Sequence, residues 1–154
     1  MGYEDKIAAH MEKIKPALNP DEEVLMTFYG KYDIKGFGPG KNLRLNGTWC
    51  MTDKRMLFTG KAGFSSSWGG MGKSGKIMTI PYGQIVEIWP KKYVIKIKHT
   101  AEHEGKKPGA TRGVTLTVHQ LRQAPDTGKK EDKQSWFART EMICNKIKEL
   151  AGIS

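Results

Sequence analysis

Hydrophobic positions along the chain change their spacing twice, from helical to alternating and back to helical. Near the N-terminus, Ile7, Met11 and Ile14 fall at i, i+4 and i+7, which predicts one apolar face of a helix over residues 3–14. Pro16 is expected to end this helix. After a turn-rich stretch, apolar and polar residues begin to alternate, as is typical of strands with one buried face.

Seven short segments carry the alternating pattern, and glycine-, proline- or charge-rich connections separate them. The polar residues 52–54 predict a tight turn that joins two of these segments as a hairpin. In the sixth segment, Ile95 and Ile97 alternate with Lys96 and Lys98, which predicts one buried face and one basic face. The predicted strands are residues 24–32, 42–51, 55–59, 76–80, 84–89, 93–99 and 114–119.

The last segment predicts an amphipathic helix. Asp132 is suited to cap its start, and Gly152 is suited to end it. Its apolar stripe recurs at intervals of four and three residues, at Trp136, Thr140, Ile143, Ile147 and Leu150. The order of elements therefore predicts a mainly β fold with α (α+β): a short N-terminal helix, about seven antiparallel strands in up-and-down order, and a C-terminal helix that closes the sheet.

The charge of the chain is uneven. Its net charge is +10, with an isoelectric point of about 9.6. Residues 1–30 carry a net charge of −3, so the remainder carries +13. Such an excess favours anionic partners, namely phospholipid headgroups, RNA, DNA or an acidic protein surface, although solubility alone is the other explanation.

Targeting signals are not apparent. The N-terminus lacks the apolar core of a signal peptide, and no apolar run approaches the roughly 20 residues of a spanning helix. Cys50 and Cys144 are expected to be reduced and mostly buried. We therefore expect a cytoplasmic protein without a transmembrane segment, and peripheral attachment to a membrane stays open.

Two stretches resemble catalytic or nucleotide motifs but lack the context that those motifs need. Ser67–Lys76 ends like a P-loop, and its Gly70, Gly72 and Gly75 spell G-x-G-x-x-G, yet a strand rather than a helix is predicted to follow. His99–His103 fits H-x-x-E-H, but a strand end does not bring both imidazoles to one zinc ion. We therefore predict no catalytic residue, metal, nucleotide or cofactor.

The connection over residues 60–76 is the predicted binding site. It is long for a hairpin connection, and it combines large apolar side chains with lysines at its base. That combination suits a membrane interface, RNA, or a groove on a protein. The alternative is that Trp68 folds back onto the barrel as local core. The predicted site residues are Phe64, Trp68, Met71, Lys61, Lys73 and Lys76.

A second basic group consists of Lys91, Lys92, Lys96 and Lys98. It is expected to lie on a face or at an edge of the sheet. Edge strands often carry lysine because the charge blocks unwanted strand pairing, and we favour this interpretation slightly over a second binding surface.

Three stretches resemble the bacterial PH-domain and GRAM-like families. They are Leu18–Val24, the hairpin Gly47–Phe58 with its Thr-Asp-Lys-Arg turn, and Ile80–Ile88 with its Ile-Pro-Tyr start. The resemblance spans roughly residues 17–151 and implies a PH-like split barrel that a C-terminal helix closes. Taken by themselves, these residues indicate a structural role in setting the path of the backbone. An example is a turn in which the side chain of Asp53 bonds nearby backbone N–H groups.

The resemblance implies a non-enzymatic interaction module. PH-like domains bind phosphoinositides, peptides or other proteins, and the bacterial versions have no common ligand. We expect docking to a protein partner or an anionic membrane surface through residues 60–76. The alternative is an RNA- or ribonucleoprotein-binding accessory factor. Residues 1–16 are predicted as an N-terminal helix and residues 17–154 as the PH-like domain, and whether the helix packs on the barrel or on a partner stays open.

Overall fold

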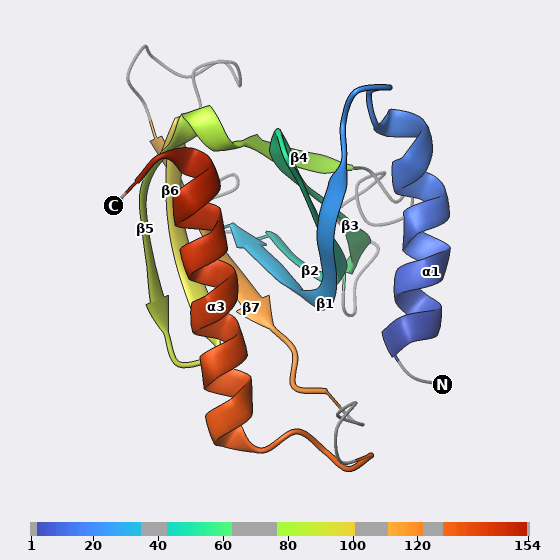
Figure 1. Cartoon of the computed structure of the whole chain (residues 1–154), viewed down its shortest axis with the longest axis vertical. Coiled ribbons are helices and arrows are strands. Elements are labelled where there is room, and N and C mark those ends of the chain that lie inside the picture. Colours follow the sequence, from blue (N-terminus) through green and yellow to red (C-terminus); the bar gives the residue numbers. More distant parts are fainter. Residues whose placement is uncertain (1–2, 35–42, 63–76, 101–110, 122–127, 154) are drawn as a thin grey trace.

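The computed structural model describes residues 3–34, 43–62, 77–100, 111–121 and 128–153. Their elements follow the predicted order, and the predicted strand ends differ from the observed ones by three residues or fewer (Figure 1). The elements are α1 (Tyr3–Ile14), η1 (Lys15–Ala17), β1 (Val24–Ile34), β2 (Leu43–Thr52), β3 (Arg55–Ala62), β4 (Met78–Pro81), η3 (Tyr82–Gln84), β5 (Ile85–Lys91), β6 (Val94–Thr100), β7 (Thr111–Val118) and α3 (Lys133–Ala151).

The strands form one antiparallel sheet in the order β4-β3-β2-β1-β7-β6-β5. Consecutive strands are neighbours in the sheet with one exception, β4 and β5, which are its two edges. The pairing of β1 with β7 joins the first four strands to the last three. Pro90 lies inside β5 rather than after it, which an edge strand tolerates because fewer of its N–H groups are needed.

Three glycines lie opposite one another across β1, β2 and β3: Gly30, Gly47 and Gly60. A Cβ atom on any of them would approach a backbone oxygen of a neighbouring strand to 2.0–2.2 Å. Because only glycine permits so close an approach, this row allows the sheet to bend sharply into a barrel.

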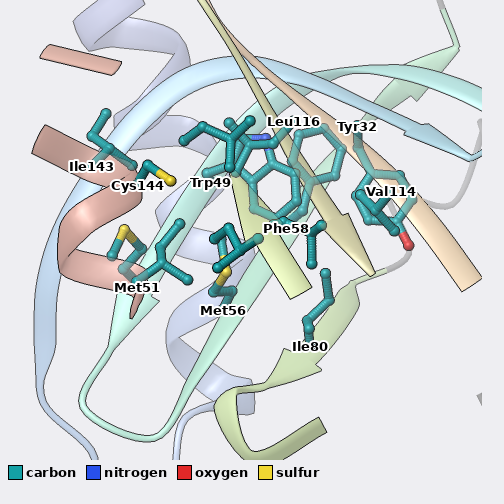
Figure 2. Close-up of a cluster of buried hydrophobic side chains, with 14 of the residues drawn as sticks. Tyr32, Trp49, Met51, Met56, Phe58, Ile80, Val114, Leu116, Ile143 and Cys144 are labelled. Carbon is teal, nitrogen blue, oxygen red and sulfur yellow. The ribbon is translucent and has the colours of Figure 1, made fainter. Parts of the chain in front are cut away.

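The barrel interior is filled by aromatic and aliphatic side chains around Trp49. The indole of Trp49 is fully buried, and its ring centroid lies 5.0 Å from that of Phe58 and 5.5 Å from that of Tyr32. Ile143 and Cys144 of α3 face this cluster (Figure 2). The closing helix therefore completes the core, as its predicted apolar stripe implies.

Both predicted ends of α3 are confirmed. The carboxylate of Asp132 accepts a hydrogen bond from the backbone N–H of Ser135 at 2.7 Å. Gly152 adopts a left-handed φ of 73°, and the N–H of Ile153 donates to the carbonyl of Lys148, which is a Schellman C-cap. The helix packs against β5, η3 and β6, across the open side of the sheet.

Helix α1 packs on the outside of the barrel, which answers the question that the sequence left open (Figure 1). Ile14 forms a small second core with Cys50 and Leu57, all fully buried. His10 Nδ1 lies 2.7 Å from Thr48 Oγ1, within hydrogen-bond distance. Both cysteines of the chain are buried and unbonded, as predicted. Among the residues that the structure describes, no helix is long and apolar enough to cross a membrane.

Candidate functional site

The predicted binding loop is described only at its start. Lys61 lies near the end of β3, with its Cα opposite Asn46. Phe64, Trp68, Met71, Lys73 and Lys76 lie outside the described residues. Their assignment to a binding site therefore stays a prediction. The strand predicted to follow the P-loop-like stretch is present as β4, in place of the helix that a P-loop requires.

The second basic group is brought together on the outer face of β5, β6 and β7. Alternate residues of a strand share a face, and the buried Ile95 and Ile97 place Lys96 and Lys98 on the opposite, outer side of β6. The register sets Lys96 between Trp89 of β5 and Thr115 of β7. It also sets Lys98 beside Gly113 of β7. The predicted division of β6 into a buried and a basic face is confirmed.

The remaining two lysines stand at the tip of the β5–β6 hairpin. Lys91 ends β5 and pairs with Val94, so Lys92 and Tyr93 form the turn. Lys92 adopts a φ of 59°, in the left-handed region that costs a non-glycine residue roughly 1 kcal/mol or more. The ring of Tyr93 stacks on Trp136 of α3 with centroids 4.7 Å apart, which holds the hairpin against the closing helix.

Two adjoining hollows occupy this outer face, and they share Lys96 and Thr115. The first encloses about 280 Å³ and is also lined by Trp89, Lys98 and Gly113. The second encloses about 270 Å³ and is lined in addition by Lys91, Lys92, Tyr93 and Val94. Together they form a shallow, lysine-rimmed surface, which we call the basic face.

The basic face carries charge that the fold does not use. The ammonium group of Lys96 donates to Thr115 Oγ1 at 3.2 Å. Within the described parts of the chain, the four lysines of the basic face make no ion pair, although Glu87 lies opposite Lys98. Trp89 stands among these lysines with 46% of its surface exposed. An exposed indole amid unneutralised ammonium groups is an unusual surface that suits an anionic partner.

The edge-strand explanation does not hold for half of this group. Lys96 and Lys98 belong to β6, which pairs with β5 on one side and with β7 on the other. A lysine in an interior strand protects no free edge. Lys91 alone lies in an edge strand, and Lys92 lies in the turn that follows it.

Trp89, Thr115 and Gly113 were missed from the sequence. The sequence did contain a signal for Trp89. It lies two residues before Lys91, so the two share one face of the strand, whereas the buried Ile88 lies on the other face. Thr115 and Gly113 could be found only once the pairing of β6 with β7 was known. Residues that share a surface through strand register carry no common motif.

The three motifs that carry the family resemblance meet at one end of the barrel. The carboxylate of Glu22 accepts two hydrogen bonds from the guanidinium of Arg55, at 2.9 and 3.0 Å. Thr52 Oγ1 donates to the same carboxylate at 2.6 Å. The phenol of Tyr82 donates to the carbonyl of Thr52 at 2.7 Å. One hydrogen-bonded group, Glu22, Thr52, Arg55 and Tyr82, therefore ties together segments far apart in the chain, and we call it the motif cluster.

The motif cluster is enclosed and electrostatically satisfied. The side chain of Glu22 is fully buried, whereas that of Arg55 is 22% exposed. The hydrogen bond from Arg55 holds the pKa of Glu22 at about 2, well below its ordinary value. These contacts give the motifs the structural role that was expected of them.

The turn between β2 and β3 differs in one detail from the prediction. Thr52 Oγ1, rather than the side chain of Asp53, accepts the backbone N–H groups of Lys54 and Arg55. The carboxylate of Asp53 instead accepts the N–H of Glu23, 30 residues earlier, at 2.9 Å. A threonine hydroxyl caps the turn, and the aspartate fastens the turn to the start of β1.

The H-x-x-E-H stretch shows no sign of a metal site in the part that is described. His99 is buried on the inner face of β6, and His103 lies outside the described residues. Across the described ranges, no group of three metal-ligating side chains comes together.

Comparison with known proteins agrees with the fold. The bacterial PH domain family matches residues 18–112, which is more than half of the chain. The chain belongs to the bacterial PH domain family. This PH domain finds no match among curated proteins. PH domains generally mediate protein or lipid interactions and are typically non-catalytic.

Solved structures with a similar arrangement include PH domains from larger proteins. The DH/PH domains of p115-RhoGEF share 10% identity with this PH domain at a TM-score of 0.48, over 92% of this chain and 34% of that chain. This PH domain thus spans about a third of that chain's length. The hSac2 domain of the human phosphoinositide phosphatase Sac2 shares 10% identity at a TM-score of 0.49, over 100% of this chain and 87% of that chain.

Proposed function

We propose that this PH domain docks on an anionic membrane surface through its basic face together with the connection over residues 60–76. The observation that carries the proposal is the exposed indole of Trp89 among the ammonium groups of Lys91, Lys96 and Lys98. Lysines near an anionic bilayer contribute about 1 kcal/mol each, and an indole prefers the depth of the headgroups.

The proposal is tested by co-sedimentation with neutral and with anionic liposomes at low and at physiological salt, while tryptophan emission is followed. We expect binding to anionic vesicles only, with a blue shift of the emission. Trp49 is fully buried in the core, so its emission is expected to change little. Trp89→Ala and Trp68→Ala, measured separately, then assign the shift to the basic face or to the loop.

Other outcomes would replace the proposal. Absence of binding to anionic vesicles at physiological salt would overturn membrane docking. Tight binding to single-stranded RNA with a steep salt dependence, and none to vesicles, would favour the RNA-binding alternative. A protein partner would show neither behaviour.

A further inference from the structure

Helix α1 covers two unlike parts of the barrel's outer surface (Figure 1). At its C-terminal end, Ile14 packs on Cys50 and Leu57, and all three are fully buried. Four residues earlier, His10 lies over β2, where its Nδ1 is 2.7 Å from Thr48 Oγ1. The family match begins at residue 18, so α1 lies outside the pattern that the family shares.

Two histidines flank Tyr29 in the polar part of this contact. The ring of His10 stacks on that of Tyr29, with centroids 6.3 Å apart. The ring of His119, which directly follows β7, meets Tyr29 edge-on at 5.2 Å. The N–H of His119 also donates to the carbonyl of Tyr29, so backbone pairing fixes this histidine beside the phenol. We call His10, Tyr29 and His119 the ring cluster.

Positive charges face each other across the boundary between α1 and the barrel at the ring cluster. On the helix, Lys6 Nζ lies 5.4 Å from the centroid of the central ring. Lys6 and Lys13 lie four residues before and three residues after His10, on the same side of α1. On the barrel, Lys31 is two residues from the tyrosine on the same face of β1 and acts electrostatically on His119. A proton on His119 therefore adds a further cation opposite those of α1.

The environment of His119 opposes that proton while α1 is in place. Burial, followed by the charges of Lys31 and Lys6, lowers the pKa of His119 to about 4. The guanidinium of Arg139 binds the carbonyl of His119 and is itself paired with the carboxylate of Glu131. An exposed histidine has a pKa near 6.5, so packing of α1 and protonation of His119 compete in mildly acidic solution.

We propose that α1 is a pH-sensitive switch: protonation of His119, opposite Lys6 and His10, releases the helix from the barrel and uncovers the apolar surface around Cys50 and Leu57. Release removes the cations of α1 and opens the ring cluster to water, so the released state binds the proton more strongly. A histidine whose pKa is lowered in the packed state stabilises packing above about pH 6.5, and this contribution is lost as the pH falls towards 4. The switch is separate from the proposed membrane docking.

The test measures how strongly α1 protects Cys50. Burial raises the pKa of this thiol to about 11, so it is unreactive while α1 covers it. Its rate of modification by methyl methanethiosulfonate is compared in native and in urea-unfolded protein at the same pH, and the ratio of the two rates is the protection factor. Mass spectrometry of peptides gives separate values for Cys50 and for Cys144, which lies in the main core against α3.

We expect the protection factor of Cys50 to fall by about tenfold between about pH 7 and pH 5. A pKa shift from 6.5 to about 4 allows roughly twentyfold at pH 5, if release restores the ordinary pKa in full. Cys50 should be less protected than Cys144 at both pH values, because its exposure requires release of α1 alone. Low concentrations of urea should therefore change the protection of Cys50 less than that of Cys144.

Two substitutions remove the titrating group in different ways. His119→Gln keeps a polar side chain, and His119→Phe keeps a ring beside Tyr29, so the test does not depend on one variant. Both should reduce the pH effect on Cys50 to less than twofold. Lys6→Gln should also reduce it, whereas Lys15→Gln, which removes an exposed lysine paired with Glu12, should keep the tenfold effect. Circular dichroism with urea unfolding checks that each variant folds.

The outcomes decide between a switch and other causes. Constant protection of Cys50 between about pH 7 and pH 5 in the wild-type protein would overturn the proposal. A pH effect that survives in both variants of His119 would show that another group titrates and would overturn it as well. Equal protection of Cys50 and Cys144 at pH 5 would assign the exposure to unfolding of the whole domain, which is also incompatible with the switch. A tenfold effect confined to Cys50 and lost in both variants supports it.

Discussion

At the end of the barrel where β2 turns into β3, charged side chains are enclosed and bonded to one another, whereas on the basic face they point into solvent. Glu22 and Arg55 form a bidentate pair with a fully buried carboxylate. Among the residues that the structure describes, Lys98 makes no ion pair even though Glu87 lies opposite it. The first arrangement uses its charges to hold the chain, and the second leaves its charges exposed.

This difference explains why the recognisable motifs do not mark the proposed binding surface. The motif cluster depends on a demanding geometry, so its residue types and spacing are restricted, and all four residues lie in the stretch that matches the bacterial PH domain family. A basic face needs only lysines on neighbouring strands whose side chains lie on the same face of the sheet. Many sequences satisfy that condition, so such a surface is difficult to recognise from the sequence.

The largest effect is expected from breaking the motif cluster. Arg55→Ala would leave the carboxylate of Glu22 buried without its cation, which we expect to lower the free energy of unfolding by about 3–5 kcal/mol. Urea unfolding measures this change. The control is Arg44→Ala on the outer face, where the pair with Asp33 is 64% exposed at the arginine, and a loss of about 1 kcal/mol or less is expected. Similar losses in both variants would contradict the comparison.

The pH dependence of stability sharpens the same comparison. The pKa of Glu22 is about 2 in the folded protein and near 4.5 when unfolded, so its pair stabilises the fold above pH 4.5. That contribution is lost as the pH falls from about 5 to 2, since protonation then favours the unfolded chain. In Glu22→Gln this part of the pH dependence should be absent. Lys96→Ala, measured in parallel by thermal unfolding, should keep the wild-type profile, and a flattened profile there would argue against the assignment.

The smallest effect on stability is expected at the tip of the basic face. Lys92→Gly relieves the left-handed φ of 59°, so the free energy of unfolding should stay within about 1 kcal/mol of wild type and not fall. Its binding to anionic vesicles should weaken about fivefold, because one lysine near the surface contributes about 1 kcal/mol. A stability loss together with unchanged binding would assign Lys92 to the fold. Urea unfolding and co-sedimentation on the same preparation give both values.

The predictions from sequence succeeded where local chemistry decides the outcome. The helix over residues 3–14, the strand alternation around Ile95 and Ile97, and both caps of α3 were all predictable. Each depends on residues within a few positions of one another, so the pattern can be recognised in the sequence alone. The turn at residues 52–55 was located correctly, but its capping residue was misassigned, because Asp53 finds its partner 30 residues away.

By itself, the sequence determined the elements, the family and the presence of a large positive charge, because periodicity, turn residues and composition are local properties. The tertiary structure decided which lysines share a surface, that Trp89 stands among them, and that Gly113 leaves a hollow there. It also decided that α1 covers the outside of the barrel. The make-up of the basic face depends on the registers of β6 with β5 and with β7, and the place of α1 depends on its packing against β1, β2 and β3, so neither is set by local sequence alone.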